Sequence, residues 1–187
     1  MGSKVYLSPI EDSHIIEYMS RSDDPELMST MGWRPFGPDE KERFLSTVEV
    51  LTLPYCSNGN TTMLSIMTIE GNRPIGYIIL KGINLANLSA ELGIAIVDSK
   101  FRSEGYGADA LALAVGYAFN NLKLLLVGLT VFPSNTRAIK AYMKAGFKNV
   151  KVLEKSWIMP SGEQVDMILM ELKKDEWKYE LCKAPIA

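Results

Sequence analysis

The chain has 187 residues, of which 47% are hydrophobic, enough to bury the core of one domain. Its 20 basic and 22 acidic residues give a formal net charge of −2 without a basic cluster, which argues against a nucleic-acid-binding protein. No run of 18 apolar residues and no signal pattern is present, so we expect a cytoplasmic protein that does not enter a membrane. Cys56 and Cys182 are too few for a disulfide framework and lack metal-site spacing, so we expect free thiols and no bound metal.

Hydrophobic patterns predict the secondary structure in chain order. A first strand is expected over residues 4–9, followed by a helix that Asp12 or Ser13 caps. Residues 23–37 read as an irregular loop, and 38–53 as a second helix. The later elements are expected in this order: strands over 61–70, 74–84 and 90–97, a helix over 105–120, a strand over 124–131, a helix over 135–145, and hairpin strands over 147–158 and 164–172. Hairpins followed by β-α-β-α indicate a mixed sheet flanked by helices, in the α/β (α+β) class.

Residues 101–107, Phe-Arg-Ser-Glu-Gly-Tyr-Gly, predict an anion site between a strand and a helix. The first turn of a helix has N–H groups without intrahelical partners, and the macrodipole adds positive potential there. Gly105 and Gly107 let the backbone approach a phosphate, and Arg102 adds charge. Alone, the glycines are equally explained by tight helix–strand packing. The sequence lacks a P-loop and the first glycine of a dinucleotide fingerprint, so neither of those sites is supported.

A second motif follows a predicted strand, and reads S-N-x-x-A-I-x-x-Y-x-x-x-G-F over residues 134–147. Together with the R-x-x-G-x-G loop, it resembles the GNAT superfamily of acetyl-CoA-dependent N-acetyltransferases, over roughly residues 74–172. The N-terminal segment, with Met31-Gly32-Trp33-Arg34-Pro35, resembles the RimJ/RimL-like branch of that superfamily.

The resemblance implies the GNAT fold, a mixed and mostly antiparallel sheet of about seven strands flanked by about four helices. It implies one N-acetyltransferase domain over residues 1–187, acetyl-CoA as cofactor, an amine acceptor and a homodimer. Contacts to the cofactor are implied for the strand before the loop, for the loop and for the second motif: Ile94, Ala95, Ile96, Val97, Arg102, Ser103, Glu104, Gly105, Tyr106, Gly107, Ala108, Asn135, Ala138 and Tyr142. Asn135 also suits the N-cap of its helix.

Acetyl transfer needs a neutral amine and a proton for the leaving thiolate. The resemblance places Tyr142 near the CoA sulfur as general acid, whereas without the motif it would be a packing residue. Some relatives carry a glutamate as base where this chain has Thr130, which cannot take that role. Glu91 is a candidate base, directly or through water, although it also fits an exposed strand carboxylate. His14 fits a surface or capping histidine better than a base.

Substrate selection is expected from the first helices and the last hairpin. Aromatic side chains suggest walls for an amine pocket, with core packing as the alternative: Trp33, Phe36, Tyr55, Tyr77 and Trp157. Of these, we predict that Trp33 and Tyr77 contact the substrate. Acidic residues in the 23–37 loop would attract a cationic amine, or would simply be solvated.

The sequence therefore predicts an N-acetyltransferase for a protein N-terminal α-amine or a small amine such as a polyamine. A non-catalytic acetyl-CoA-binding regulatory module is the alternative. A nucleotide-utilising transferase would need a Mg²⁺-binding carboxylate or a P-loop lysine, and neither is evident.

Overall fold

The computed structural model describes residues 4–21, 23–35, 37–40 and 60–178. Phe36, Tyr55, both cysteines and most of the helix expected over 38–53 lie outside the described residues. The first part of that helix, residues 38–40, is helical as predicted.

Seven strands form one sheet in the order β1-β2-β3-β4-β5-β7-β6, which confirms the predicted mixed sheet. Their bounds are Val5–Pro9 (β1), Thr62–Thr68 (β2), Pro74–Asn84 (β3), Ser89–Ile96 (β4), Leu126–Val131 (β5), Lys148–Ile158 (β6) and Gln164–Lys173 (β7). In the described part of the sheet β4 and β5 are the parallel pair, and the other neighbours are antiparallel. Two parallel strands need a crossover connection, and the chain between β4 and β5 forms a helix.

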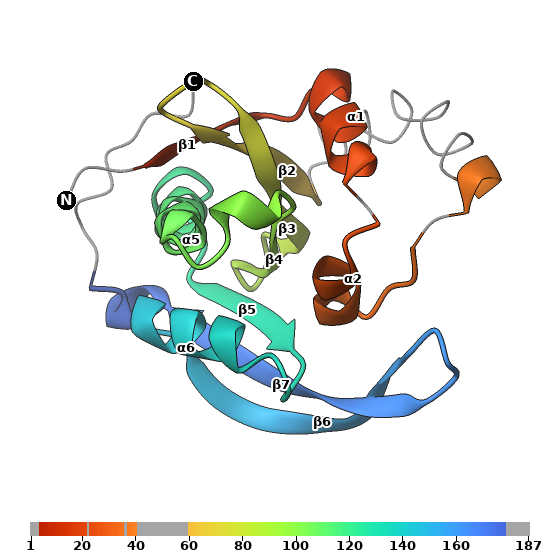
Figure 1. Cartoon of the computed structure of the whole chain (residues 1–187). Helices are drawn as coiled ribbons and strands as arrows, with labels where there is room; N and C mark the ends of the chain where they lie inside the picture. Colours follow the sequence, from red (N-terminus) through yellow and green to blue (C-terminus); the bar gives the residue numbers. More distant parts are fainter. Residues whose placement is uncertain (1–3, 22, 36, 41–59, 179–187) are drawn as a thin grey trace.

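Two α-helices follow the motifs that the sequence analysis identified (Figure 1). Helix α5, Tyr106–Gly116, connects β4 to β5 and continues into a π-helical turn over Tyr117–Asn121. Helix α6, Thr136–Ala145, follows β5 and ends at Gly146 in the left-handed conformation. Short 3₁₀ turns span Ser99–Phe101 and Lys174–Glu176.

The N-terminal helices correct two predictions. Helix α1, Asp12–Ser20, is preceded by Glu11 as its N-cap, and neither Asp12 nor Ser13 fills that position. Helix α2, Pro25–Met31, lies where an irregular loop was predicted. Asp24 caps α2 by accepting a hydrogen bond from the Leu27 N–H at 2.8 Å, and Pro25 suits the first helical position because it lacks an N–H. A helix of seven residues is too short to show a clear period of 3.6, which is why the pattern was missed.

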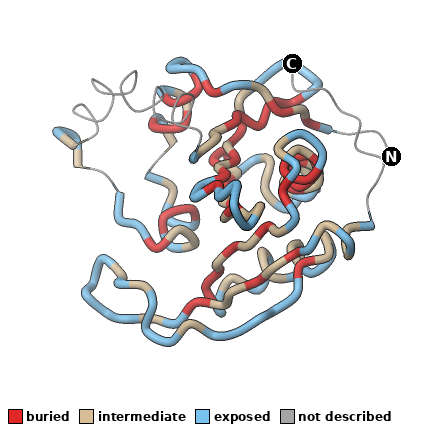
Figure 2. Tube along the Cα trace, turned by 180° about the vertical axis from the view of Figure 1, so that it is seen from behind, coloured by how far each residue is buried: buried red, intermediate tan, exposed pale blue. Residues whose placement is uncertain are grey.

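Two hydrophobic cores lie on the sheet (Figure 2). The larger core joins the sheet to α5 and includes Phe119 and Leu111, both almost fully buried. The smaller core joins α1 and α2 to the sheet. Strand β4 and the residue after it contribute to both, since Ile94 and Ile96 pack against the larger core while Ala95 and Val97 belong to the smaller one. This alternation follows from the period of two in a strand.

Candidate active site

Strands β4 and β5 pair along only part of their length. Ser89, Ala90 and Glu91 are opposite residues 126–128 of β5, and no further pair follows between these strands. Strand β4 nevertheless continues to Ile96 and β5 to Val131. The two strands therefore diverge toward their C-terminal ends. The predicted cofactor residues Ile94, Ala95 and Ile96 lie on this unpaired part of β4, and Val97 directly follows it. No neighbouring strand among the described residues pairs with the β5-facing edge of this part.

The predicted anion loop comes directly after β4 and has the required backbone conformation. Gly105 is the N-cap of α5 at φ 88°, in the left-handed region that glycine adopts without strain. A Cβ on Gly107 would lie 3.5 Å from Ile96 Cγ1, so helix and strand pack closely there. The N–H groups of Tyr106, Gly107 and Ala108 lie in the first helical turn and lack intrahelical partners. The loop can therefore present several donors to one anion.

Arg102 is held by protein atoms. Its Nε donates to the Ile96 carbonyl at 2.9 Å and its Nη2 to the Val97 carbonyl at 2.8 Å. Its Nη1 contacts Asp24 Oδ1 at 3.0 Å and Glu26 Oε2 at 3.1 Å, and the side chain is 7% exposed. Four of the five guanidinium N–H groups can be satisfied in this way. The sequence predicted that the positive charge of Arg102 would contact a phosphate. In this structure it faces the carboxylates of Asp24 and Glu26, and a phosphate contact stays a prediction.

Lys4 is a basic residue near the loop that sequence reasoning missed. Its Nζ donates to the Glu104 carbonyl at 2.6 Å and lies 5.0 Å from the centre of the Tyr106 ring. Its backbone N–H binds Asp109 in the first turn of α5. Lys4 is about 100 residues from the loop in sequence, so no local pattern could have indicated this contact.

The second motif places its residues on one face of α6. Asn135 accepts a hydrogen bond from the Ala138 N–H at 3.1 Å, which confirms the predicted cap. Ala138 and Tyr142 are four residues apart, on the same side of the helix, and both pack against the larger core. The Tyr142 ring contacts Phe147 at 6.0 Å between centroids. Burial raises the pKa of Tyr142 to about 12, and its hydroxyl has no hydrogen-bond partner among the described residues.

Glu91 lies at the paired end of the strands, away from the divergent part. It is opposite Gly128 of β5, and its carboxylate pairs with Lys81 at 3.0 Å. Ala95 lies four positions further along the strand, a distance of about 13 Å. A role of Glu91 as base stays a prediction. The ion pair with Lys81 agrees with the alternative, an exposed strand carboxylate.

The aromatic candidates are distributed around α2. Tyr77 of β3 is opposite Ala95 and packs against the ring of Tyr18 at 5.9 Å. Trp33 follows the C-terminal end of α2 and is 44% exposed. Trp157 of β6 donates to the Gly32 carbonyl at 3.4 Å and contacts Phe132 edge to face. Of the two predicted substrate contacts, Tyr77 borders the smaller core and Trp33 is available at the surface.

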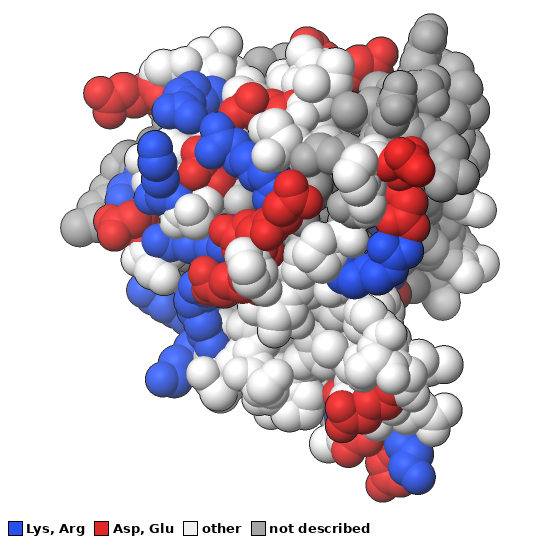
Figure 3. All heavy atoms as spheres, turned by 45° about the vertical axis from the view of Figure 1, so that its right-hand side comes forward, with Lys and Arg blue, Asp and Glu red and all other residues white. Residues whose placement is uncertain are grey.

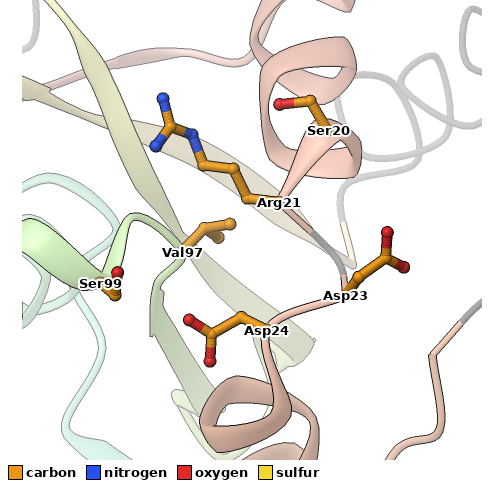
Figure 4. A pocket seen from close by; sticks show the side chains of 6 residues that line it. All are labelled: Ser20, Arg21, Asp23, Asp24, Val97 and Ser99. Carbon is orange, nitrogen blue, oxygen red and sulfur yellow. The ribbon is translucent and has the colours of Figure 1, made fainter.

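A small polar pocket lies between the end of α1, the start of α2 and the end of β4 (Figure 4). Its volume is about 240 Å³, and it is lined by Ser20, Arg21, Asp23, Asp24, Val97 and Ser99. The neighbouring Asp98 is buried and pairs with Arg21 at 2.8 Å. Its Oδ1 also accepts from the Lys100 N–H, so Asp98 fixes the turn between β4 and the anion loop.

His14 is buried, which corrects the expectation of a surface histidine. Its Nδ1 accepts from the Glu11 N–H at 3.3 Å, as a capping role predicts, and lies 2.7 Å from Ser65 Oγ. Desolvation lowers the pKa of His14, and the Glu11 carboxylate partly offsets that effect. The burial of its ring, the cap at Glu11 and the contact with Ser65 make His14 a structural residue in this geometry.

No group of metal-binding side chains occurs among the residues that the structure describes. In the same residues, no helix combines the length and hydropathy that a membrane span requires. Figure 3 shows acidic and basic side chains next to one another on the visible face, without a broad basic surface.

Comparison with known proteins places this site in a family. The model of the acetyltransferase (GNAT) domain matches residues 4–148. The chain is similar to spermidine N-acetyltransferase from Vibrio cholerae, solved with CoA and spermine, at a TM-score of 0.81 and 20% identity, covering 94% of this chain and 98% of the other. It is also similar to RimJ from Mycobacterium smegmatis in complex with CoA-disulfide, at a TM-score of 0.78 and 18% identity, covering 91% and 82%.

A curated relative is the L-amino acid N-acetyltransferase AaaT of Escherichia coli (strain K12), 33% identical over 81 residues. The matched stretch spans 43% of this chain and about half, 49%, of that relative. The family model covers most of the chain, including the anion loop and the second motif. The chain therefore belongs to the GNAT acetyltransferase family.

Proposed function

We propose that this protein is an acetyl-CoA-dependent N-acetyltransferase that acts on a primary amine. The observation that carries the proposal is the divergence of β4 and β5 between the anion loop on one side and α6 on the other. The resulting opening joins an anion-binding backbone to an extended strand edge. A phosphorylated, amide-bearing arm such as that of CoA matches both features.

The residues present fit such a cofactor. The pyrophosphate would accept hydrogen bonds from the first turn of α5, where Gly105 leaves room for close approach. The pantetheine amides would pair with the β5-facing edge of β4 over Ile94–Ile96 as an added strand does. The Ile96 carbonyl on this edge also accepts from Arg102. Asn135 and Ala138 would border the same arm from α6. Ser103, Glu104 and Tyr106 complete the loop, and the lysine beside it, Lys4, adds a positive charge.

In the proposed reaction, the amine nitrogen attacks the thioester carbonyl, the carbon–sulfur bond breaks, and the thiolate takes a proton. Tyr142 is the proposed donor. A phenol of pKa about 12 stays protonated at neutral pH and is therefore always available to donate. Burial raises the pKa of a thiol as well, so a sulfur in the same apolar surroundings remains a suitable acceptor.

The amine must lose a proton before or during its attack. The side chain of Thr130 on β5 cannot accept it at neutral pH. Glu91 is too far along β4 to reach the acetyl group directly, so it would act through water.

The proposed acceptor is a protein N-terminal α-amine or a small amine such as a polyamine. The names of the relatives support an amine in general, since they act on spermidine or L-amino acids. We further propose that residues 1–187 form one cytoplasmic domain of the RimJ/RimL-like branch, which acts as a homodimer.

The proposal is tested by thermal unfolding with acetyl-CoA, in parallel with a thiol-release assay on a panel of amines and peptides. A ligand that binds only the native state raises the melting temperature, by an amount that grows with its concentration over Kd. A shift together with thiol release for one amine class is the expected result. Absence of a shift at saturating acetyl-CoA would overturn the cofactor assignment. A shift without release for any acceptor would favour the non-catalytic module.

A further inference from the structure

Helix α2 contacts both walls of the opening between β4 and β5. One wall is β4 with the loop that follows it, and the other is β5 with the segment that follows it, including α6. At its N-terminal end, Asp24 and Glu26 contact Arg102, which belongs to the loop after β4. At its C-terminal end, Gly32 receives the Trp157 N–H, and Trp157 packs on Phe132 just after β5. Figure 1 shows α2 near the ends of these strands, with the arrowhead of β5 pointing toward it. The contacts of α2 therefore depend on the distance between the two walls.

Glu26 makes the connection that spans the opening. Its Oε2 lies 3.1 Å from Arg102 Nη1 on the β4 side, and its Oε1 lies 2.6 Å from Arg137 Nη1 on α6, on the β5 side. One carboxylate on α2 thus binds an arginine from each wall. Of the two arginines, Asp24 contacts only Arg102, so among the described residues Glu26 is the carboxylate at α2 that also reaches α6.

The two halves of this bridge differ in strength. Arg102 is nearly buried and is also fixed by two carbonyl oxygens and Asp24. The Arg137 side chain is 49% exposed and that of Glu26 is 53% exposed, so solvent screens their attraction. An exposed pair of this kind contributes little by itself and exchanges readily between partners. The Glu26–Arg137 contact is therefore the adjustable half, and its occupancy depends on where α6 stands relative to the loop after β4.

We propose that Glu26 is a positioning residue that couples α2 to the cofactor opening. A cofactor bound between the walls contacts the loop next to Arg102 and Asn135 next to Arg137, so it fixes the distance that the Glu26 carboxylate spans. With both arginines held, Glu26 orders α2. Helices α1 and α2 form the side on which we expect the amine to bind, the acceptor side. This inference rests on the proposed function, because it takes the opening as the CoA site. Its consequence is that CoA binding prepares the acceptor side without contacting it.

The test is amide hydrogen exchange of residues 27–31, with and without CoA, in the unaltered protein and in Glu26→Gln. In the unaltered protein we expect CoA to slow exchange in this segment about fivefold or more, the lower end of usual coupling factors. Glu26→Gln, which keeps the shape and removes the charge, should reduce the slowing to less than about twofold. The acceptor KM should rise in this variant, while the Kd of CoA stays within about twofold.

Glu176→Gln is the matched control. It breaks the Lys148–Glu176 pair, which has the same length of 2.6 Å but lies outside the opening, and it should leave the exchange of α2 unchanged. Arg137→Gln removes the other partner of Glu26 and should reproduce the loss, so that a folding defect in one variant does not decide the outcome. Equal slowing in Glu26→Gln and the unaltered protein, with CoA bound to both, would overturn this inference alone. If the unaltered protein does not bind CoA, the proposed function fails first.

Discussion

The two faces of the sheet are built differently. The face that carries α5 rests on 24 buried core residues among those described, whereas the face that carries α1 and α2 rests on eight. On the α5 face, the anion loop and the edge of β4 offer backbone groups whose positions depend on the main chain. On the other face, ion pairs such as Asp24–Arg102 supplement a small core. If the proposed sites are correct, a rigid cofactor side combined with a lightly anchored acceptor side would let the acceptor vary while the fold is retained.

Core truncation gives the largest expected effect and tests this difference directly. Phe119 is fully buried in the larger core and its ring lies 5.5 Å from that of Trp177 in a tilted arrangement, so Phe119→Ala should lower the free energy of unfolding by about 4 kcal/mol. Met28→Ala in the smaller core should cost about 2 kcal/mol. Urea unfolding measures both. Equal losses, or a larger loss for Met28→Ala, would contradict the view that the larger core dominates stability.

Removal of the Tyr142 hydroxyl is next in size. Tyr142→Phe keeps the ring against Phe147 and deletes the proposed proton donor, so kcat should fall about 100-fold, a typical contribution of general acid catalysis. The Kd of CoA should change little, because Tyr142→Phe keeps the ring that the resemblance places against the cofactor and removes only the hydroxyl. Tyr117→Phe, on a tyrosine packed against the same core, is the control and should leave kcat unaltered. A kcat retained in Tyr142→Phe would remove this residue from the mechanism.

The sequence predicted the strands and helix starts around the anion loop and α6 well because their signals are local. Gly105 and the α5 helix that it caps are adjacent in the chain, and Asn135 reaches the Ala138 N–H three residues on. The seven strands were expected from alternation, from short apolar runs and from turn residues, all of which are local patterns. Such features depend on backbone conformation and short spacing, which a single sequence records.

The acceptor side could not be predicted in the same way. Arg102 finds its carboxylate partners 76 and 78 residues away, at Glu26 and Asp24, so a motif built from seven consecutive residues could not reveal them. The burial of His14 depends on Ser65, 51 residues along the chain. Short α2 lacked a readable period, although Asp24 and Pro25 together are a start signal that could have identified it. Long-range pairing, and not residue chemistry, was the missing information.

Glycine substitution at the loop gives a smaller effect and separates fold from site. Gly105 and Gly162 have almost identical φ values, 88° and 87°, and a Cβ at either position meets no atom closer than 3.8 Å. Gly105→Ala and Gly162→Ala should therefore cost the same stability, about 1 kcal/mol, through left-handed backbone strain. Only Gly105→Ala should weaken CoA binding, by about tenfold, since its Cβ would stand beside the proposed phosphate site. Calorimetric titration with CoA measures this, and equal affinities in both variants would contradict the loop assignment.

The smallest expected effect concerns the pH dependence of stability on the acceptor side. His14 has a lowered pKa in the folded protein because of desolvation, while in the unfolded chain it returns to about 6.5. The folded state then binds fewer protons than the unfolded state, so His14 reduces stability as pH falls from about 7 through 6.5 toward the folded pKa. His14→Gln removes this titration, and its urea-unfolding free energy should change less than that of the unaltered protein between about pH 7.5 and 5. The acidic groups with lowered pKa, Asp24 and Glu26, are present in both proteins, so their contribution cancels in the difference. Equal pH dependence in both proteins would mean that the buried ring is protonated without cost, and that the smaller core is open to water at His14.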